Sequence, residues 1–155
     1  MKKIFLVLFL SILLFTGCEN KEENEKNDYL DMKSQLLSHK EFISLEELTC
    51  DIVVNIDRKD EEKVIYEVVL SKPKENMNNI KAVLVHNYYT EDVFPTIGLF
   101  DDTKSLFVNS QDSITLTGSI KTDKDIDNLN LMLKLLIRYT TDDGVKKDIY
   151  YKTTK

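Results

Sequence analysis

The pattern of hydrophobic and polar residues changes character along the 155-residue chain. Residues 4–15 are apolar with one polar exception, and residues 19–28 are almost entirely polar. From residue 48 onward, apolar side chains alternate with polar ones. A period of two is typical of a β-strand with one buried face, because successive side chains of a strand point to opposite sides. The pattern therefore predicts a β-rich domain over residues 48–155.

The longest alternating stretch is LNLMLKLLIRY, residues 129–139. A helix would scatter its apolar side chains around the circumference, whereas a strand gathers them on one face. The apolar face of this predicted strand consists of Leu129, Leu131, Leu133, Leu135, Ile137 and Tyr139. The sequence TTDDG follows, and its Asp-Gly step before a new alternation is typical of a β-hairpin.

Several further segments have strand character, and they are separated by turns rather than by helical patterns. They are residues 48–57, 64–71, 80–89, 113–121 and 145–152, with short strands near 97–100 and 105–109. About seven strands at this spacing predict an all-β, antiparallel sandwich that resembles the immunoglobulin-like or fibronectin-type architecture. The Cys…Trp…Cys signature of true immunoglobulin domains is missing, because the chain has no tryptophan. A small β-barrel is the alternative.

A lead-in segment, residues 29–47, precedes the sandwich. Its apolar residues Tyr29, Met32, Leu36 and Leu37 lie at helical spacings, which predicts a short helix over residues 29–38. An irregular segment that packs through the same side chains is the alternative.

The first 18 residues combine a basic start, MKK, with a 12-residue apolar stretch, Ile4–Phe15, and the tripeptide TGC. The apolar stretch is shorter than the roughly 20 residues of a transmembrane helix. The segment resembles a bacterial lipoprotein signal peptide, whose lipobox matches Phe15-Thr16-Gly17-Cys18, with Phe15 where Leu is more common. The resemblance implies that residues 1–17 are removed and that Cys18 carries a diacylglycerol. A signal peptide cut elsewhere and a retained anchor helix are the alternatives.

The resemblance places the protein on the extracytoplasmic face of the cell membrane, with residues 18–28 as the lipidated cysteine and a flexible polar tether. The formal net charge is −6, and loss of Lys2 and Lys3 would leave 19 basic against 27 acidic residues, a net charge of −8. Such a surface repels phosphate backbones and anionic headgroups. We therefore expect no nucleic-acid partner and a membrane contact that depends on the lipid.

Candidate metal and catalytic residues are few. The two histidines, His39 and His86, lie far apart, and we expect His86 to be a hydrogen-bonded residue of the fold. The sequence TDKDIDN begins like a calcium-binding EF-hand loop, but Asn128 stands where glycine is required and Lys134 where glutamate is required. No nucleophile motif occurs. The sequence thus predicts no metal, no cofactor and no enzymatic activity.

The second cysteine, Cys50, has apolar neighbours two residues away on either side, Leu48 and Ile52. It therefore faces the core of the predicted sandwich. We expect a buried structural thiol rather than a reactive one, because reactive thiols need exposed, electropositive surroundings.

One loop region concentrates aromatic residues, within HNYYTEDVFPTIGLFDD at residues 86–102. Tyr88, Tyr89 and Phe94 are candidates for a contact surface, because aromatic side chains are enriched at protein interfaces. Alternatively, Phe94 and Phe100 plug the end of the sandwich.

The sequence therefore favours a lipid-anchored extracytoplasmic binding or accessory module that engages a protein or an envelope component, a protein being preferred. A structural or protective surface lipoprotein without a dedicated ligand is the alternative, and a lipoprotein enzyme is the third hypothesis.

Overall fold

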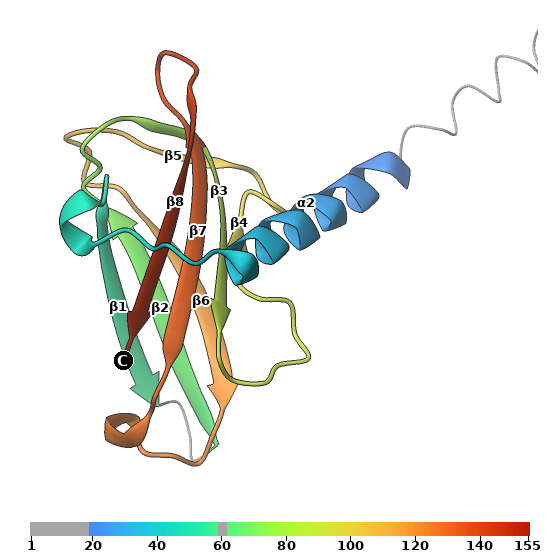
Figure 1. Ribbon diagram of the computed structural model, residues 1–155, viewed down its shortest axis with the longest axis vertical. Coiled ribbons are helices and arrows are strands. Elements are labelled where there is room, and N and C mark those ends of the chain that lie inside the picture. Colours follow the sequence, from blue (N-terminus) through green and yellow to red (C-terminus); the bar gives the residue numbers. More distant parts are fainter. Residues whose placement is uncertain (1–18, 59–61) are drawn as a thin grey trace, which may run out of the picture.

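The computed structural model describes residues 19–58 and 62–155, so the leader, the lipobox and Cys18 lie outside the described residues. Eight strands and one α-helix form in this part of the chain (Figure 1). The helix is α2 (Glu19–Ser38), and two 3-10 turns are η1 (Leu45–Glu47) and η2 (Ile126–Asn128). The strands are β1 (Asp51–Arg58), β2 (Lys63–Ser71), β3 (Met77–His86), β4 (Thr96–Ile97), β5 (Lys104–Leu106), β6 (Ser113–Lys121), β7 (Met132–Thr140) and β8 (Lys146–Thr154).

The strands form two antiparallel sheets that face each other. One sheet has the order β1-β2-β6, and the other has the order β4-β3-β7-β8, with β5 also paired to β3. The first sheet corresponds to strands A, B and E of an immunoglobulin-like sandwich, and β3, β7 and β8 correspond to strands C, F and G. The predicted all-β sandwich is confirmed. The barrel alternative is wrong, because the two sheets share no strand.

The main core lies between the two sheets. The whole predicted face of residues 129–139 is buried there, with at most 4% of any of its six apolar residues exposed. Facing residues of the other sheet, such as Val64, Val68 and Leu116, are also at most 1% exposed. Period-two patterning thus identified the inward face correctly, although β7 itself begins only at Met132.

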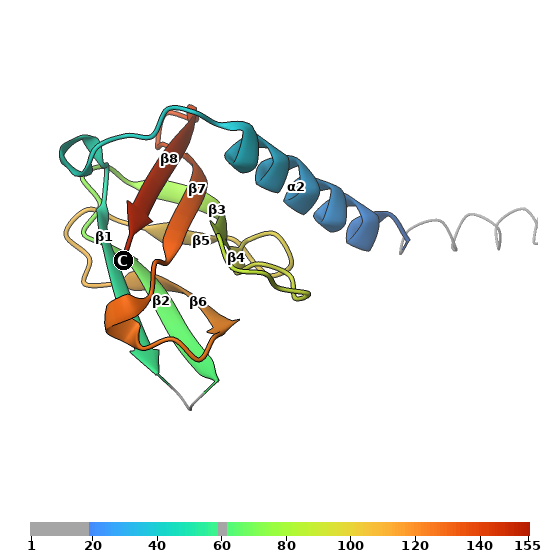
Figure 2. The ribbon, with the colours of Figure 1, turned by 60° about the horizontal axis from the view of Figure 1, so that its bottom comes forward.

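A second core lies on the outer face of the larger sheet, under α2 (Figure 2). Strands β3 and β7 bury residues on both faces, and the outward-facing Val83, Val85 and Leu136 are at most 3% exposed. Helix α2 covers them with Tyr29, Met32 and Leu36, spaced three and four residues apart on one face of the helix. The molecule therefore has three layers: a sheet, a second sheet and a helix.

Helix α2 is longer than the predicted helix, because it begins at Glu19 and not near Tyr29. The expectation of a flexible tether over residues 19–28 is corrected by this finding. Once the turns around Met32 are fixed against the sheet, each further residue extends an existing helix and requires no new nucleus. The ion pair between Lys21 and Glu25, at 3.7 Å, adds a small local contribution. No helix among the described residues has the length and apolar character of a membrane span.

Polar contacts hold α2 at both ends of its docked segment. The ammonium group of Lys81 on β3 lies 2.6 Å from the Asp28 carboxylate. Arg138 on β7 donates to Gln35 at 3.0 Å and to the Asp148 carboxylate at 2.7 Å. These bonds fix the rotation of the helix on the sheet, which determines what lies next to the β3–β4 loop.

Candidate functional site: a polar pocket beside strand β6

The loop at residues 87–95, between β3 and β4, folds back against the strand that precedes it. The Pro95 carbonyl accepts a hydrogen bond from the Leu84 amide at 3.0 Å. Asn87 accepts from the Met132 amide at 2.9 Å, which ties the start of the loop to β7. Within the loop, the Asp92 amide donates to the Thr90 hydroxyl at 3.1 Å. The loop is therefore an ordered turn with defined side-chain positions.

The three aromatic residues expected to form a contact surface have different environments. Tyr88 is half-buried against the main core, whereas Tyr89 is 84% exposed. Phe94 is half-buried against the helix core, and its amide donates to the Tyr29 hydroxyl at 3.3 Å. The structure thus leaves Tyr89 at the surface and packs Phe94 against the residues under α2, on the outer face of the larger sheet and not at the end of the sandwich. Phe100 is 45% exposed, with its ring 5.5 Å from that of Tyr29.

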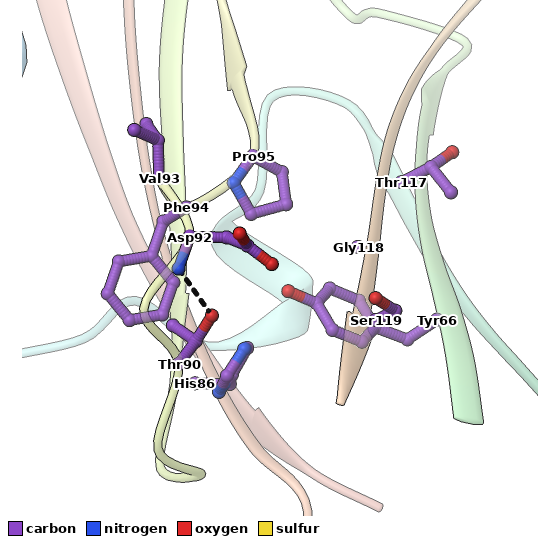
Figure 3. A pocket seen from close by; sticks show the side chains of 10 residues that line it. All are labelled: Tyr66, His86, Thr90, Asp92, Val93, Phe94, Pro95, Thr117, Gly118 and Ser119. Atoms are coloured by element: carbon purple, nitrogen blue, oxygen red, sulfur yellow. Dashed lines mark hydrogen bonds between the residues drawn. The ribbon is translucent and has the colours of Figure 1, made fainter. Parts of the chain in front are cut away.

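A cavity of about 210 Å³ lies between this loop and β6 (Figure 3). β6 is the edge of the smaller sheet and β4 is the edge of the larger one, so the cavity lies at an open side of the sandwich. Its lining residues are Tyr66, His86, Thr90, Asp92, Val93, Phe94, Pro95, Thr117, Gly118 and Ser119. The Tyr66 hydroxyl, the His86 ring and the Asp92 carboxylate point toward the same space (Figure 3).

Tyr66 reaches this cavity across a glycine. It pairs with Gly118 of β6, and a Cβ atom at residue 118 would lie 2.2 Å from the Tyr66 hydroxyl oxygen. Only glycine therefore leaves room for the ring in this position. Tyr66 is 1% exposed, and its hydroxyl has no hydrogen-bond partner among the described residues. Burial raises the pKa of Tyr66, so the hydroxyl stays protonated and acts as a donor.

His86 presents a second donor. Its Nδ1 accepts a hydrogen bond from the Tyr88 amide at 3.2 Å, so the proton of the neutral ring is on Nε2. Burial lowers the pKa of His86, which favours this neutral form. The ring makes edge contacts with Tyr66 at 5.6 Å and with Phe94 at 5.0 Å. The expected hydrogen-bonded histidine is confirmed, and it also lines the cavity.

Asp92 is the one charged residue among the described residues that line the cavity, and its carboxylate stands beside the neutral donors of Tyr66 and His86. A phenol whose pKa is raised is a poor general base, and His86 makes no hydrogen bond to a hydroxyl or thiol within residues 19–58 and 62–155. The described residues also contain no cluster of three potential metal ligands. The arrangement is therefore suited to hydrogen-bond recognition.

Cys50 lies in the main core, away from this site. It is 2% exposed, and burial, with a smaller contribution from Asp51, raises the pKa of its thiol to about 11. The expectation of a buried thiol is confirmed.

A wider hollow of about 460 Å³ adjoins the cavity and shares Thr90, Asp92 and Ser119 with it. Lys63 and Lys121 also line this hollow, opposite the acidic residues of the loop. The rim of the combined groove carries two exposed hydrophobic side chains, Tyr89 and Val93, which are 84% and 62% exposed.

Sequence reasoning missed the central residues of this groove. The alternation of residues 113–121 does place Gly118 on the inward face, where a missing side chain leaves space, and Tyr66 faces it from β2. That pairing could have been found only with the strand register, which single-sequence patterns do not provide.

Comparisons of the chain with protein-family models, with curated proteins and with solved structures found no match.

Proposed function

We propose that this protein is a lipid-anchored extracytoplasmic binding module that engages a protein partner through the groove between loop 87–95 and strand β6. The observation that carries the binding role is the Tyr66 hydroxyl, which is buried without a hydrogen-bond partner among the described residues, in a cavity whose rim exposes Tyr89. The anchor rests on the lipobox-like residues Phe15–Cys18.

The groove contains a buried polar group, the Tyr66 hydroxyl, whose hydrogen bond is not satisfied among the described residues. A buried hydroxyl without a hydrogen bond costs roughly 1–3 kcal/mol, and phenylalanine would avoid that cost. Exposed tyrosine is enriched where proteins bind one another, because it contributes a large rigid surface with a polar tip. Both features favour a partner that supplies the missing contacts, and they favour binding over catalysis.

A protein partner is favoured by the free edge of β6. Among the described strands it pairs only with β2, so its other edge carries backbone groups without a strand partner in that part of the chain, beside the groove. The edge of β8, in contrast, is partly covered, because the Ile43 amide donates to the Tyr150 carbonyl at 3.0 Å. A strand of another protein can therefore be added to β6 without displacing a segment that pairs with its edge.

The length and position of α2 indicate where the groove would lie relative to the proposed lipid anchor. A 20-residue helix is about 30 Å long, and α2 contacts the sheet from Asp28 onward, through the ion pair with Lys81 and the apolar residues that follow. The nine residues before Asp28 thus form a helical spacer of about 14 Å. Loop 87–95 extends from the sandwich on the same side as the free end of α2 (Figures 1 and 2). We infer that the groove is presented to a partner near the membrane surface.

The anchor is tested by partitioning in a detergent that separates into two phases. The wild-type protein should enter the detergent phase, and Cys18→Ala should remain in the aqueous phase. Equal partitioning of the two proteins would refute the lipid anchor.

The binding role is tested by placing a photo-crosslinking phenylalanine analogue at residue 89 of the full chain in intact cells. We expect one discrete protein adduct. The matched control has the analogue at Phe107, which is also exposed, at 47%, but does not line the groove. Adducts of the same mass and yield from both positions, or no adduct from residue 89, would refute the proposed surface.

A further inference from the structure

We propose that the cavity beside Gly118 binds a neutral carboxamide, the side chain of a glutamine or asparagine in an extended segment of the partner protein. This inference rests on the proposed function and identifies the chemical group that the groove recognises.

The donors and acceptor of the cavity define the group. The Tyr66 hydroxyl and Nε2 of His86 offer two hydrogens, and neither atom makes a hydrogen bond in the described part of the chain. The Asp92 carboxylate offers an acceptor. A carboxamide carries an acceptor oxygen and a donor NH₂ on the same carbon, so it can satisfy both sides of the cavity.

Charged groups fit less well. An ammonium or guanidinium group would pair with Asp92 but would face the two hydrogens of Tyr66 and His86, since cationic groups cannot accept hydrogen bonds. A carboxylate would accept from the two donors but would be repelled by Asp92 and by the net charge of −6. A neutral group with both functions avoids both conflicts.

The size and position of the cavity agree with one side chain of a paired strand. Its volume of about 210 Å³ is far above the roughly 10–15 Å³ that a single water molecule requires by the same measure, so the cavity has room for a polar side chain. Side chains of a strand added to β6 would alternate between the outward face and the space between the sheets. Opposite Gly118 the inward side chain of such a strand would meet no β6 side chain, so it could enter the cavity.

The test uses three small probes and the isotope-labelled full chain in detergent micelles, with binding followed through the Gly118 amide resonance. The probes are the N-acetyl, N-methylamide derivatives of glutamine, glutamate and lysine. We expect millimolar binding of the glutamine probe and at least about tenfold weaker binding of the other two, a difference of roughly 1.4 kcal/mol.

Tyr66→Phe separates recognition from structure. It removes one hydroxyl and keeps the ring over Gly118, so we expect an unchanged or higher melting temperature together with about tenfold weaker binding of the glutamine probe. Tyr88→Phe is the matched control, since Tyr88 lines the adjoining hollow but not the cavity, and it should leave the affinity unchanged. A hydroxyl with no role in recognition would leave the affinity of Tyr66→Phe unchanged.

Each contrary result has a separate meaning. Tighter binding of the lysine probe would show a cation site, and tighter binding of the glutamate probe would show an anion site, so either overturns the carboxamide assignment. An adduct from residue 89 that forms equally well in Tyr66→Phe would overturn this inference while leaving the proposed function intact. Absence of the adduct in the wild-type background would refute the proposed function itself.

Discussion

Leu36 is the residue at which the docking of α2 on the sheet can be measured most directly. Its side chain is completely buried in the helix core, against residues that include Val85 and Leu136. Leu37, its neighbour in the sequence, is 53% exposed, because successive residues of a helix lie about 100° apart around its axis. The two positions have the same residue type and the same helix, and they differ in packing. Leu36→Ala and Leu37→Ala therefore form a matched pair.

The expected magnitude follows from what each substitution removes. Replacing a fully buried leucine with alanine costs about 2–5 kcal/mol, and we expect about 3 kcal/mol for Leu36→Ala. Because α2 packs on a separate apolar cluster on the outer face of the larger sheet, the lost free energy should mainly weaken the docking of the helix on that sheet. A change of 3 kcal/mol raises the undocked population about 100-fold. For Leu37→Ala we expect less than about 0.5 kcal/mol.

Two assays measure these effects. With a urea m-value of about 1.5 kcal/mol/M, the transition midpoint of Leu36→Ala should fall by about 2 M if the helix and the sandwich unfold together. If the helix undocks alone, tryptic cleavage after Lys33 should instead accelerate about 100-fold, because cleavage follows the open population. Equal urea midpoints and equal cleavage rates for the two variants would refute the assignment of the buried face of α2.

Two further predictions concern titratable groups. Hydrogen bonds from Lys147, at 2.7 Å, and from Tyr139, at 2.5 Å, lower the pKa of Glu75. A carboxylate with a lowered pKa stabilises the fold at pH values above the ordinary glutamate pKa. This contribution to stability is lost as the pH falls through the pKa of the folded state. Above about pH 5.5 the unfolding free energy of the wild type should therefore be larger than that of Glu75→Gln, and below about pH 4 the difference should disappear. Urea titrations at several pH values measure this difference, and a difference that does not change with pH would contradict the prediction. The Cys50 thiol, with a pKa of about 11, should resist a chromogenic disulfide reagent near pH 8 until the protein is unfolded, and reaction of native protein at the unfolded rate would show that the thiol is accessible.

The sandwich could be predicted from the sequence because its strands have one strong inward face. The six inward residues of 129–139 are all buried between the sheets, as their alternation predicts. The helix layer was harder to predict from the sequence, because it packs on the outward faces of the same strands. Val83 and Leu136 lie on those faces, and local patterning alone does not show whether a helix or solvent covers such residues. The segment 19–28 was predicted to be flexible because its composition cannot form a core, yet it continues a helix that is docked elsewhere.

The pocket could not be predicted, because its residues come from four separate elements and are brought together only by strand register and loop folding. Tyr66 is on β2, Gly118 on β6, His86 at the end of β3 and Asp92 in the following loop. None of them belongs to a local motif. The aromatic content of residues 86–102 did point to the correct loop, but it could not show that Tyr89 is exposed while Phe94 packs against α2.

The pairing of Tyr66 with Gly118 also bears on why residue 66 is a tyrosine, because a role in recognition and a role in stability would favour different residues there. Phenylalanine at residue 66 would keep the ring packing and would remove an unsatisfied buried group, so stability alone favours phenylalanine. Glycine within a strand is itself unfavourable, by about 0.5–1 kcal/mol relative to alanine. The fold thus carries two local costs at one cross-strand pair, and together they place a hydroxyl where no described residue bonds to it. Costs of this kind are expected at binding sites, where the missing partner is supplied by a ligand. The melting temperature of Tyr66→Phe measures what the hydroxyl costs the fold, and the affinity of the same variant for the glutamine probe measures what the hydroxyl contributes to recognition.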